Sequence, residues 1–369
     1  MSDKLVVATK KGVFTIERQR GWTLTRGSLL GQNAPVVLPD SRDGSIYAAV
    51  ALGHFGPKMH RSRDGGATWE ELTPPVYPER PPDADDVDPF RGRPIPWSVE
   101  LIWSLEAGGA DQPGRLWCGT IPGGLFRSDD GAATWELVRP LWDRPERRQW
   151  FGGGYDFAGI HSICVDPTDS DHVSLGVSCG GVWATFDGGA TWESRATGMR
   201  AAYMPPEQAY NPNVQDPHRV VQCPAAPSAF WAQHHNGVFR STDGAASWQE
   251  IENVQPSTFG FAIAVHPHDP ETAWTVPAIR DEDRRPVDGQ LVVSRTRDGG
   301  RSWEVFREGL PQEWAYDLTY RHGLDVDESG DRLAFGTTTG SLWVSEDGGC
   351  SWQAVSHHLP PISCVRFVK

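Results

Sequence analysis

The sequence predicts an all-β fold, a seven-bladed β-propeller formed by residues 1–369 as a single domain. A motif of eight residues, Ser/Thr-x-Asp-Gly-Gly/Ala-x-Ser/Thr-Trp, occurs six times at steps of 49 to 66 residues. A long, regular period indicates an array of one supersecondary unit. Strand-like runs flank the copies, and no long amphipathic helical pattern interrupts them. The 40 glycines and 17 tryptophans are typical of many short strands joined by turns.

Blade 1 is predicted from both ends of the chain. Residues 1–30 contain three strand-like runs, Leu5–Thr9, Gly12–Ile16 and Gly21–Thr25, but no intact copy of the motif. The missing inner strand is available at the other end, in residues 362–369. Pairing the last strand with the first sheet closes the ring and removes its open edge.

Blades 2 to 7 each contain one copy of the motif, between their third and fourth strands. Asp-Gly predicts a hairpin turn, because Gly adopts positive φ and Asp accepts hydrogen bonds from nearby N–H groups. The Trp is a large apolar anchor that the next blade can cover. Because a catalytic residue is needed only once, the repetition indicates a structural role for these aspartates. The copies occupy residues 62–69, 128–135, 185–192, 241–248, 296–303 and 345–352.

This motif resembles the Asp box, or BNR repeat, of sialidases, sortilin-type receptors and xyloglucanases. The whole chain is similar to single-domain bacterial BNR-repeat proteins of the glycosyl hydrolase-like kind. The resemblance implies a sialidase-like propeller with Asp-box hairpins. A glycoside hydrolase of sialidase-like or xyloglucanase-like type is therefore one alternative for the function.

The residues known from these two enzyme families are not found in their expected places. Sialidases use three arginines and carry an Arg-Ile-Pro motif near the start, whereas the nearest match here, Arg93-Pro-Ile-Pro96, has another order and lies in an insertion. Xyloglucanases place catalytic aspartates between two seven-bladed domains, and this chain has room for one such domain.

Composition excludes several classes of partner. A formal net charge of −14 argues against binding to nucleic-acid phosphates. No apolar run has the length that a membrane span needs, and Met1–Thr9 lacks the apolar core of a signal peptide. The six cysteines form no C-x-x-C pair, which predicts buried free thiols in a reducing compartment. We therefore expect a cytoplasmic protein.

The long insertions all fall in loops that open on one face of the predicted ring. They join one blade to the next or connect the second and third strands of a blade, and the motif turns on the other face stay short. Long loops on one face of a rigid scaffold indicate binding or catalysis there. The insertions are residues 73–97, 139–160, 198–217 and 277–289.

Equivalent positions on the inner strands predict a group of side chains around the channel mouth. Counting back six residues from the proline that closes each strand gives His161, His218 and Phe261. Register places His322 at this position in blade 7, and blades 2 and 3 offer Asn33 and Leu101 beside Glu100. The candidate catalytic residues are His161, His218, His322 and Glu100. The candidate ligand-binding residues are Asn33, His54, Lys58, His234, His235 and Asn236.

Three interpretations of these histidines stay open. They are hydrogen-bonded polar groups around channel water, or an acid–base site of a hydrolase for a small polar or anionic molecule or a glycan. The third is a divalent metal held by His161, His218 and His322. A non-catalytic scaffold that binds a protein partner on the same face is the alternative function.

Three loop segments have two interpretations each. Gly152–Asp156 is a lid or a plain turn, and Met204–Asp216 offers aromatic and amide groups to a sugar or packs over the rim. The charged run Arg280–Pro286 is expected to be a solvated hairpin tip.

Overall fold

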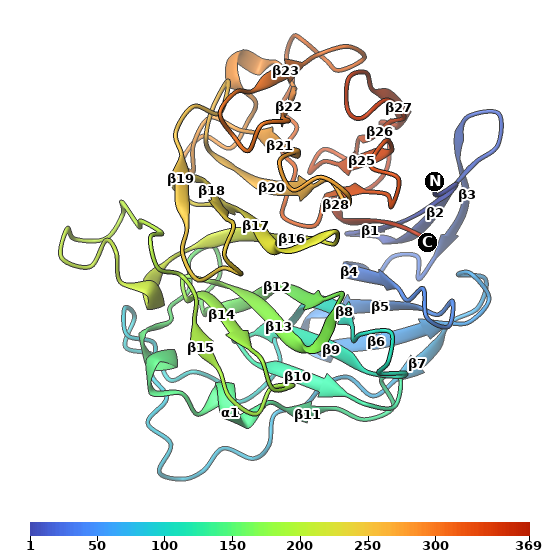
Figure 1. The fold of residues 1–369 in the computed structure, drawn as a ribbon. Coiled ribbons are helices and arrows are strands. Elements are labelled where there is room, and N and C mark those ends of the chain that lie inside the picture. The colour runs from blue at the N-terminus through green and yellow to red at the C-terminus, as the bar shows by residue number, and fades with distance from the viewer.

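A computed structural model describes all of residues 1–369 as seven antiparallel sheets of four strands each. Figure 1 shows the sheets arranged in a ring, with the chain passing round it once and the two termini close together. The predicted all-β, seven-bladed propeller is confirmed. No helix is both long and apolar enough to cross a membrane, and all six cysteines are unpaired.

Blades 2 to 7 are each built from four consecutive strands, numbered from the channel outward. Blade 2 contains β4 (Asn33–Pro39), β5 (Ile46–Ala51), β6 (Pro57–Ser62) and β7 (Glu70–Leu72), and blade 3 contains β8 (Leu101–Ala107), β9 (Leu116–Ile121), β10 (Leu125–Ser128) and β11 (Glu136–Leu137). Blade 4 contains β12 (Gly159–Asp166), β13 (Asp169–Ser178), β14 (Gly181–Thr185) and β15 (Glu193–Ser194), and blade 5 contains β16 (Pro217–Cys223), β17 (Ala226–His234), β18 (Gly237–Ser241) and β19 (Gln249–Ile251). Blade 6 contains β20 (Gly260–Val265), β21 (Ala273–Pro277), β22 (Val293–Thr296) and β23 (Glu304–Phe306), and blade 7 contains β24 (Leu324–Val326), β25 (Leu333–Gly336), β26 (Leu342–Ser345) and β27 (Gln353–Ser356).

Blade 1 closes the ring as predicted. Its strands follow the order β28 (Ile362–Phe367), β1 (Lys4–Thr9), β2 (Gly12–Arg18) and β3 (Trp22–Ser28). β28 pairs antiparallel with β1, with Leu5 opposite Phe367 and Val7 opposite Val365. Apolar side chains from both termini share one core cluster with blade 7, so closure buries the two edges that an open ring would expose.

The six motif turns share one hydrogen-bond pattern. In blade 4, Oδ1 of Asp187 accepts bonds from the Thr185 hydroxyl (2.7 Å) and the Thr191 N–H (2.8 Å), and Oδ2 accepts one from the Thr191 hydroxyl (2.6 Å). Gly188 and Gly189 have φ of 68° and 96°, which is the left-handed region that glycine adopts without strain. The aspartates therefore satisfy the polar groups of their own turns.

The insertions and the turns between second and third strands lie at one end of the ring, opposite the motif turns. Short helices occur in several of them: η1 (Gly53–Phe55), α1 (Arg139–Trp142), η2 (Pro145–Gln149), η3 (Pro212–Val214) and η4 (Val287–Gly289). The segment of residues 307–323, which joins β23 to β24, is a further long connection that the sequence analysis did not identify. It carries residues of the candidate site.

Candidate functional site

A pocket of about 860 Å³ opens at the mouth of the channel on the long-loop face. This volume lies in the range of about 300–1,000 Å³ that is usual for small-molecule sites. Every blade contributes to its wall, from Lys10 and Ile362 of blade 1 to His322 and Thr338 of blade 7. Of the 27 residues in the wall, 10 are hydrophobic. The long-loop face thus has a pocket of mixed polar and apolar lining with room for a small ligand.

β-Bulges at the start of the inner strands decide which side chains enter this region. The pairing register skips His161 in β12, His218 in β16 and Trp103 in β8. A bulge turns the extra residue away from the regular alternation of the strand. The blade-3 equivalent of the two histidines is therefore Trp103, and the prediction of Leu101 for that position is wrong because counting along the sequence does not see a bulge.

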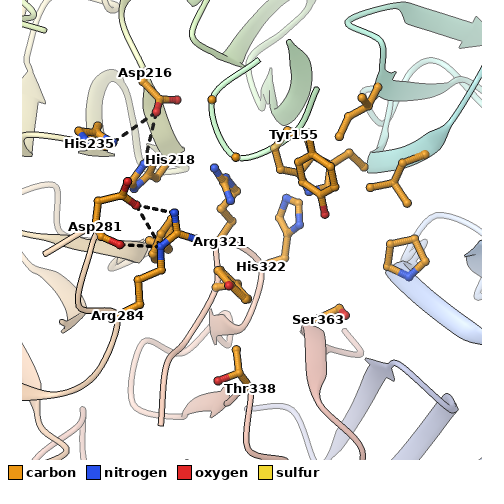
Figure 2. A pocket seen from close by; sticks show the side chains of 18 of the residues that line it. Tyr155, Asp216, His218, His235, Asp281, Arg284, Arg321, His322, Thr338 and Ser363 are labelled. Carbon is orange, nitrogen blue, oxygen red and sulfur yellow. Dashed lines mark hydrogen bonds and ion pairs between the residues drawn. The ribbon is translucent and has the colours of Figure 1, made fainter. Parts of the chain in front are cut away.

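Asp216, which precedes β16, is the centre of a compact polar group with His218 and His235. One carboxylate oxygen, Oδ2, lies 3.5 Å from Nε2 of His218 and 3.6 Å from Nδ1 of His235. The other, Oδ1, accepts hydrogen bonds from the Cys179 N–H (3.1 Å) and the Ser178 hydroxyl (3.2 Å). Figure 2 shows the two imidazoles converging on this carboxylate.

The pKa values of all three residues in this group are shifted by burial and by their mutual contacts. Burial works to raise the pKa of Asp216, but the contacts from His218 and His235 hold it well below its usual value. Burial also lowers the pKa of His235, yet Asp216 outweighs this effect and raises that pKa overall. For His218 burial prevails over Asp216, and the pKa is lowered. The result is an ionised aspartate that orients one histidine and raises its pKa.

Nε2 of His235 is the ring nitrogen that this geometry leaves available to a ligand. Nδ1 faces Asp216, the side chain is 24% exposed, and the residue lines the pocket. The Nδ1 atom of His218, in contrast, lies 2.7 Å from the Gly260 carbonyl oxygen. His235 can therefore exchange a proton with a molecule in the pocket while Asp216 fixes its orientation.

Glu100 contributes a second carboxyl group with an opposite perturbation. It lies just before β8 in blade 3 and lines the pocket, with blade 4 between it and Asp216. Burial, followed by the nearby charge of Asp156, raises the pKa of Glu100, and Arg93 opposes this effect. The pocket thus carries one carboxyl group biased toward the protonated form and one held ionised.

Two arginines face the same aromatic ring in the pocket. The guanidinium carbons of Arg284 and Arg321 lie 5.2 Å and 5.3 Å from the centre of the Phe261 ring. Arg284 forms an ion pair with Asp281. The loop of residues 280–286 is largely solvent-exposed, as expected, with the side chains of Arg284 and Asp281 38% and 37% exposed. These two side chains also line the pocket (Figure 2).

The structure brings together half of the residues that the sequence singled out. Five of them line the pocket: Asn33, Glu100, His218, His235 and His322. His161 and His234 are fully buried beside it: the His161 carbonyl oxygen lies 2.6 Å from Nε2 of His322, and Nε2 of His234 accepts a bond from the Asp216 N–H. The remaining three residues, His54, Lys58 and Asn236, lie outside the pocket wall.

The set of side chains able to share a metal ion differs from the predicted one. His161, His218 and His322 do not bring three ligand atoms together. Asp216, His218 and His235 do, with their ligand atoms all within 4.8 Å of one another. Two imidazoles and a carboxylate are a donor set that suits zinc or iron.

Sequence reasoning missed Asp216, Trp103 and Arg321 as site residues. Asp216 was noted only as the end of a loop, although it lies two residues before His218. Arg321 precedes His322 in the connection that was not identified. In both cases, the closeness in sequence to a candidate histidine could have indicated the residue.

The chain is similar in sequence to xyloglucanases. It is 27% identical over 290 residues to a probable oligoxyloglucan-reducing end-specific xyloglucanase of Neosartorya fischeri, and 25% identical over 288 residues to an oligoxyloglucan-reducing end-specific xyloglucanase of Emericella nidulans. Each alignment covers 69% of this chain and 32% of the relative, so the chain spans about a third of their length. No protein-family model matches the chain.

Solved structures show the same fold at low sequence identity. The GH74 xyloglucanase of Xanthomonas campestris superposes with a TM-score of 0.64 at 16% identity, covering 97% of this chain and 53% of that one. An ancestral GH74 enzyme gives 0.60 at 17% identity, covering 85% of this chain and 36% of that one. YCF48 from Cyanidioschyzon merolae gives 0.54 at 12% identity, with 94% and 96% covered. The chain is thus a seven-bladed propeller whose sequence relatives and structural neighbours include xyloglucanases.

Proposed function

We propose that this propeller hydrolyses a glycosidic bond in a short glycan held in the pocket. The observation that carries the proposal is that the pKa values of two carboxyl groups in the pocket are shifted in opposite directions. The pKa of Glu100 is raised, and that of Asp216 is lowered, so that Asp216 stays ionised beside His235. Titratable groups whose pKa values are pushed apart identify an acid and a base. The similarity to proteins named xyloglucanases supports a glycan as the substrate class.

Glu100 acts as the general acid in this proposal, and His235 as the general base. Glu100 donates its proton to the glycosidic oxygen as the bond from that oxygen to the anomeric carbon breaks. Nε2 of His235 takes a proton from the water that attacks the same carbon, and Asp216 stabilises the imidazolium that forms. Inverting glycosidases divide the work between a general acid and a general base, and the base is usually a carboxylate. In this proposal His235 takes the place of that base.

Aromatic side chains around the pocket fit the apolar faces of sugar rings. Tyr155 and Tyr203 line the pocket and are 44% and 39% exposed. The volume of the pocket and the polar groups in its wall favour such a ligand over the alternative of a protein scaffold.

The test is turnover of xyloglucan oligosaccharides and of a panel of neutral and acidic oligosaccharides, with new reducing ends counted by mass spectrometry. We expect cleavage by the unaltered protein and a loss of kcat of about 100-fold or more in Glu100→Gln and in His235→Asn. Because the acid must be protonated, activity falls as the pH rises through the raised pKa of Glu100, and Glu100→Gln loses this alkaline limb.

The control variant is Glu136→Gln, which removes a carboxylate from β11, the outer strand of blade 3, and should leave turnover unchanged. Absence of cleavage for every saccharide, or full activity of Glu100→Gln, contradicts the proposal.

Metal-assisted hydrolysis is a second candidate, supported by the grouping of Asp216, His218 and His235. In that case the metal supplies the activated water, and these three side chains hold it. Elemental analysis of the purified protein separates the two candidates. One equivalent of zinc or iron, lost in His218→Ala together with activity, supports the metal, and full activity after chelation supports the acid–base pair.

A further inference from the structure

Arg321 differs from the three other arginines that are less than a tenth exposed. The other three are matched by carboxylates: Arg147 by Asp86, Arg295 by Glu304 and Arg332 by Asp3. Arg321 is 9% exposed and forms no ion pair, and its Nε atom is buried without a hydrogen-bond partner. A buried cation without an ion-pair partner destabilises a fold. The absence of a carboxylate beside Arg321 therefore needs an explanation.

The guanidinium of Arg321 is held in place by aromatic rings. It lies over Trp103, with 4.7 Å between the guanidinium carbon and the ring centre, and 5.3 Å from the centre of Phe261. All three residues line the pocket. Figure 2 shows Arg321 beside His322, with the Asp216 group on one side and Tyr155 on the other. Stacking fixes the plane of the guanidinium and leaves its N–H groups for a ligand.

No acidic residue of the pocket forms an ion pair with Arg321, although the charge of Asp216 opposes the lowering of its pKa by burial. Asp216 lies beyond ion-pair distance of it and is occupied by His218 and His235. Asp281 is paired with Arg284. Glu282 pairs instead with Arg280 at 3.8 Å, where both side chains are exposed. The remaining positive charge in the wall is therefore available to an anion in the pocket.

We propose that Arg321 binds the carboxylate of an acidic sugar, so that the substrate is a saccharide containing a uronic-acid type residue. This inference rests on the proposed glycan site and names its substrate class. A planar carboxylate matches the fork of N–H donors on one guanidinium. The ionised carboxylate of Asp216 in the same wall disfavours the second charge of a phosphate dianion.

The first test is ligand binding by calorimetry with matched probes. Glucuronate and glucose have the same ring and differ in the carboxylate. We expect glucuronate to bind at least tenfold more tightly than glucose, and Arg321→Gln to remove that preference while its weak glucose binding is retained. Arg321→Lys is expected to restore only part of it, because an ammonium lacks the fork.

Several other binding results would overturn the proposal in whole or in part. Equal binding of glucuronate and glucose, or an unchanged preference in Arg321→Gln, overturns the proposal. Tighter binding of glucose 6-phosphate than of glucuronate overturns the choice of a carboxylate. Benzoate binding that depends on Arg321, with neither sugar bound, overturns the saccharide substrate and the proposed function, while the carboxylate site itself stands.

A stability measurement distinguishes a binding role from a structural one. Without ligand, Arg321→Gln removes an uncompensated buried charge and should raise the Tm by about 2 °C or more. The matched variant Arg147→Gln leaves Asp86 without its buried partner and should lower the Tm. A lower Tm in Arg321→Gln would assign the arginine to the fold and overturn the proposal. Arg285→Gln, at an exposed ion pair with Asp283 outside the pocket wall, controls for the change in net charge.

Discussion

Chemically identical side chains in this ring have different roles because their surroundings differ. His161 is fully buried, and burial holds its pKa well below the usual value, so it stays neutral. His235 is partly exposed and faces Asp216, which raises its pKa. Only the second histidine combines a raised pKa with a place in the pocket wall. Burial and partners decide the function here, and residue type alone does not.

The repeated aspartates and Asp216 show the same contrast. Each repeated aspartate accepts hydrogen bonds from its own turn, as Asp187 does from Thr185 and Thr191. Asp216 instead receives bonds from another blade and contacts two histidines in the pocket wall. The repeated aspartates therefore stabilise their turns, and Asp216, which is not repeated, forms part of the candidate site.

Asp187→Asn should lower the Tm and leave ligand affinity unchanged. The hydrogen bonds from Thr191 lower the pKa of Asp187 to about 2, below the value of about 3.9 in an unfolded chain. Its carboxylate therefore contributes stability that is fully present above about pH 4 and is lost as the pH falls toward 2. Thermal melts should show a smaller difference between variant and parent at about pH 3 than at about pH 6. An identical difference at both values would mean that the charge of Asp187 does not contribute.

Part of the site could be predicted from the sequence, because ring symmetry makes some positions equivalent. The alignment of the inner strands identifies His218, His322 and the neighbouring Glu100 from the sequence alone. It failed at Leu101, since the bulge in β8 moves Trp103 to that place. It also could not show that Arg321 lacks a partner, because pairing depends on loops from other blades.

Among the strands and turns, the features that could be predicted are those whose structure depends on residues close together in the sequence. The six motif turns need only residues close in sequence, and all six form as expected. The 307–323 connection has no such pattern, and its course depends on packing against blades 6 and 7. The strands were therefore predicted better than the loops that form the site.

Deleting Ile362–Lys369, which contains β28, should abolish soluble folded protein. The strand buries Ile362, Val365 and Phe367 and covers the inner edge of β1. At about 1.5–3 kcal/mol for each of these side chains, the loss is comparable to the whole stability of a domain, about 5–15 kcal/mol. Expression and thermal melts provide the measurement. Removal of the exposed Lys369 alone is the control, and a truncated chain with the parental Tm would disprove ring closure by β28.

At the scale of the whole molecule, the closed ring joins residues that are far apart in sequence. Lys10, Glu100, Asp216 and His322 lie in different blades and share one pocket wall. Inner strands converge on the channel, so each blade contributes side chains at its mouth. The repeats predicted this convergence. The shape and charge of the pocket come from the insertions, which do not repeat.

The central claim is that this pocket binds a saccharide between Glu100, His235 and Arg321. The most direct measurement is a crystal structure of the Glu100→Gln variant with an acidic oligosaccharide, in which slowed cleavage keeps the substrate intact. We predict a glycosidic oxygen within hydrogen-bond distance of the side chain at position 100, a water beside Nε2 of His235, and a sugar carboxylate on Arg321. A saccharide bound elsewhere on the ring, or a pocket that holds only solvent at saturating saccharide, would contradict the account.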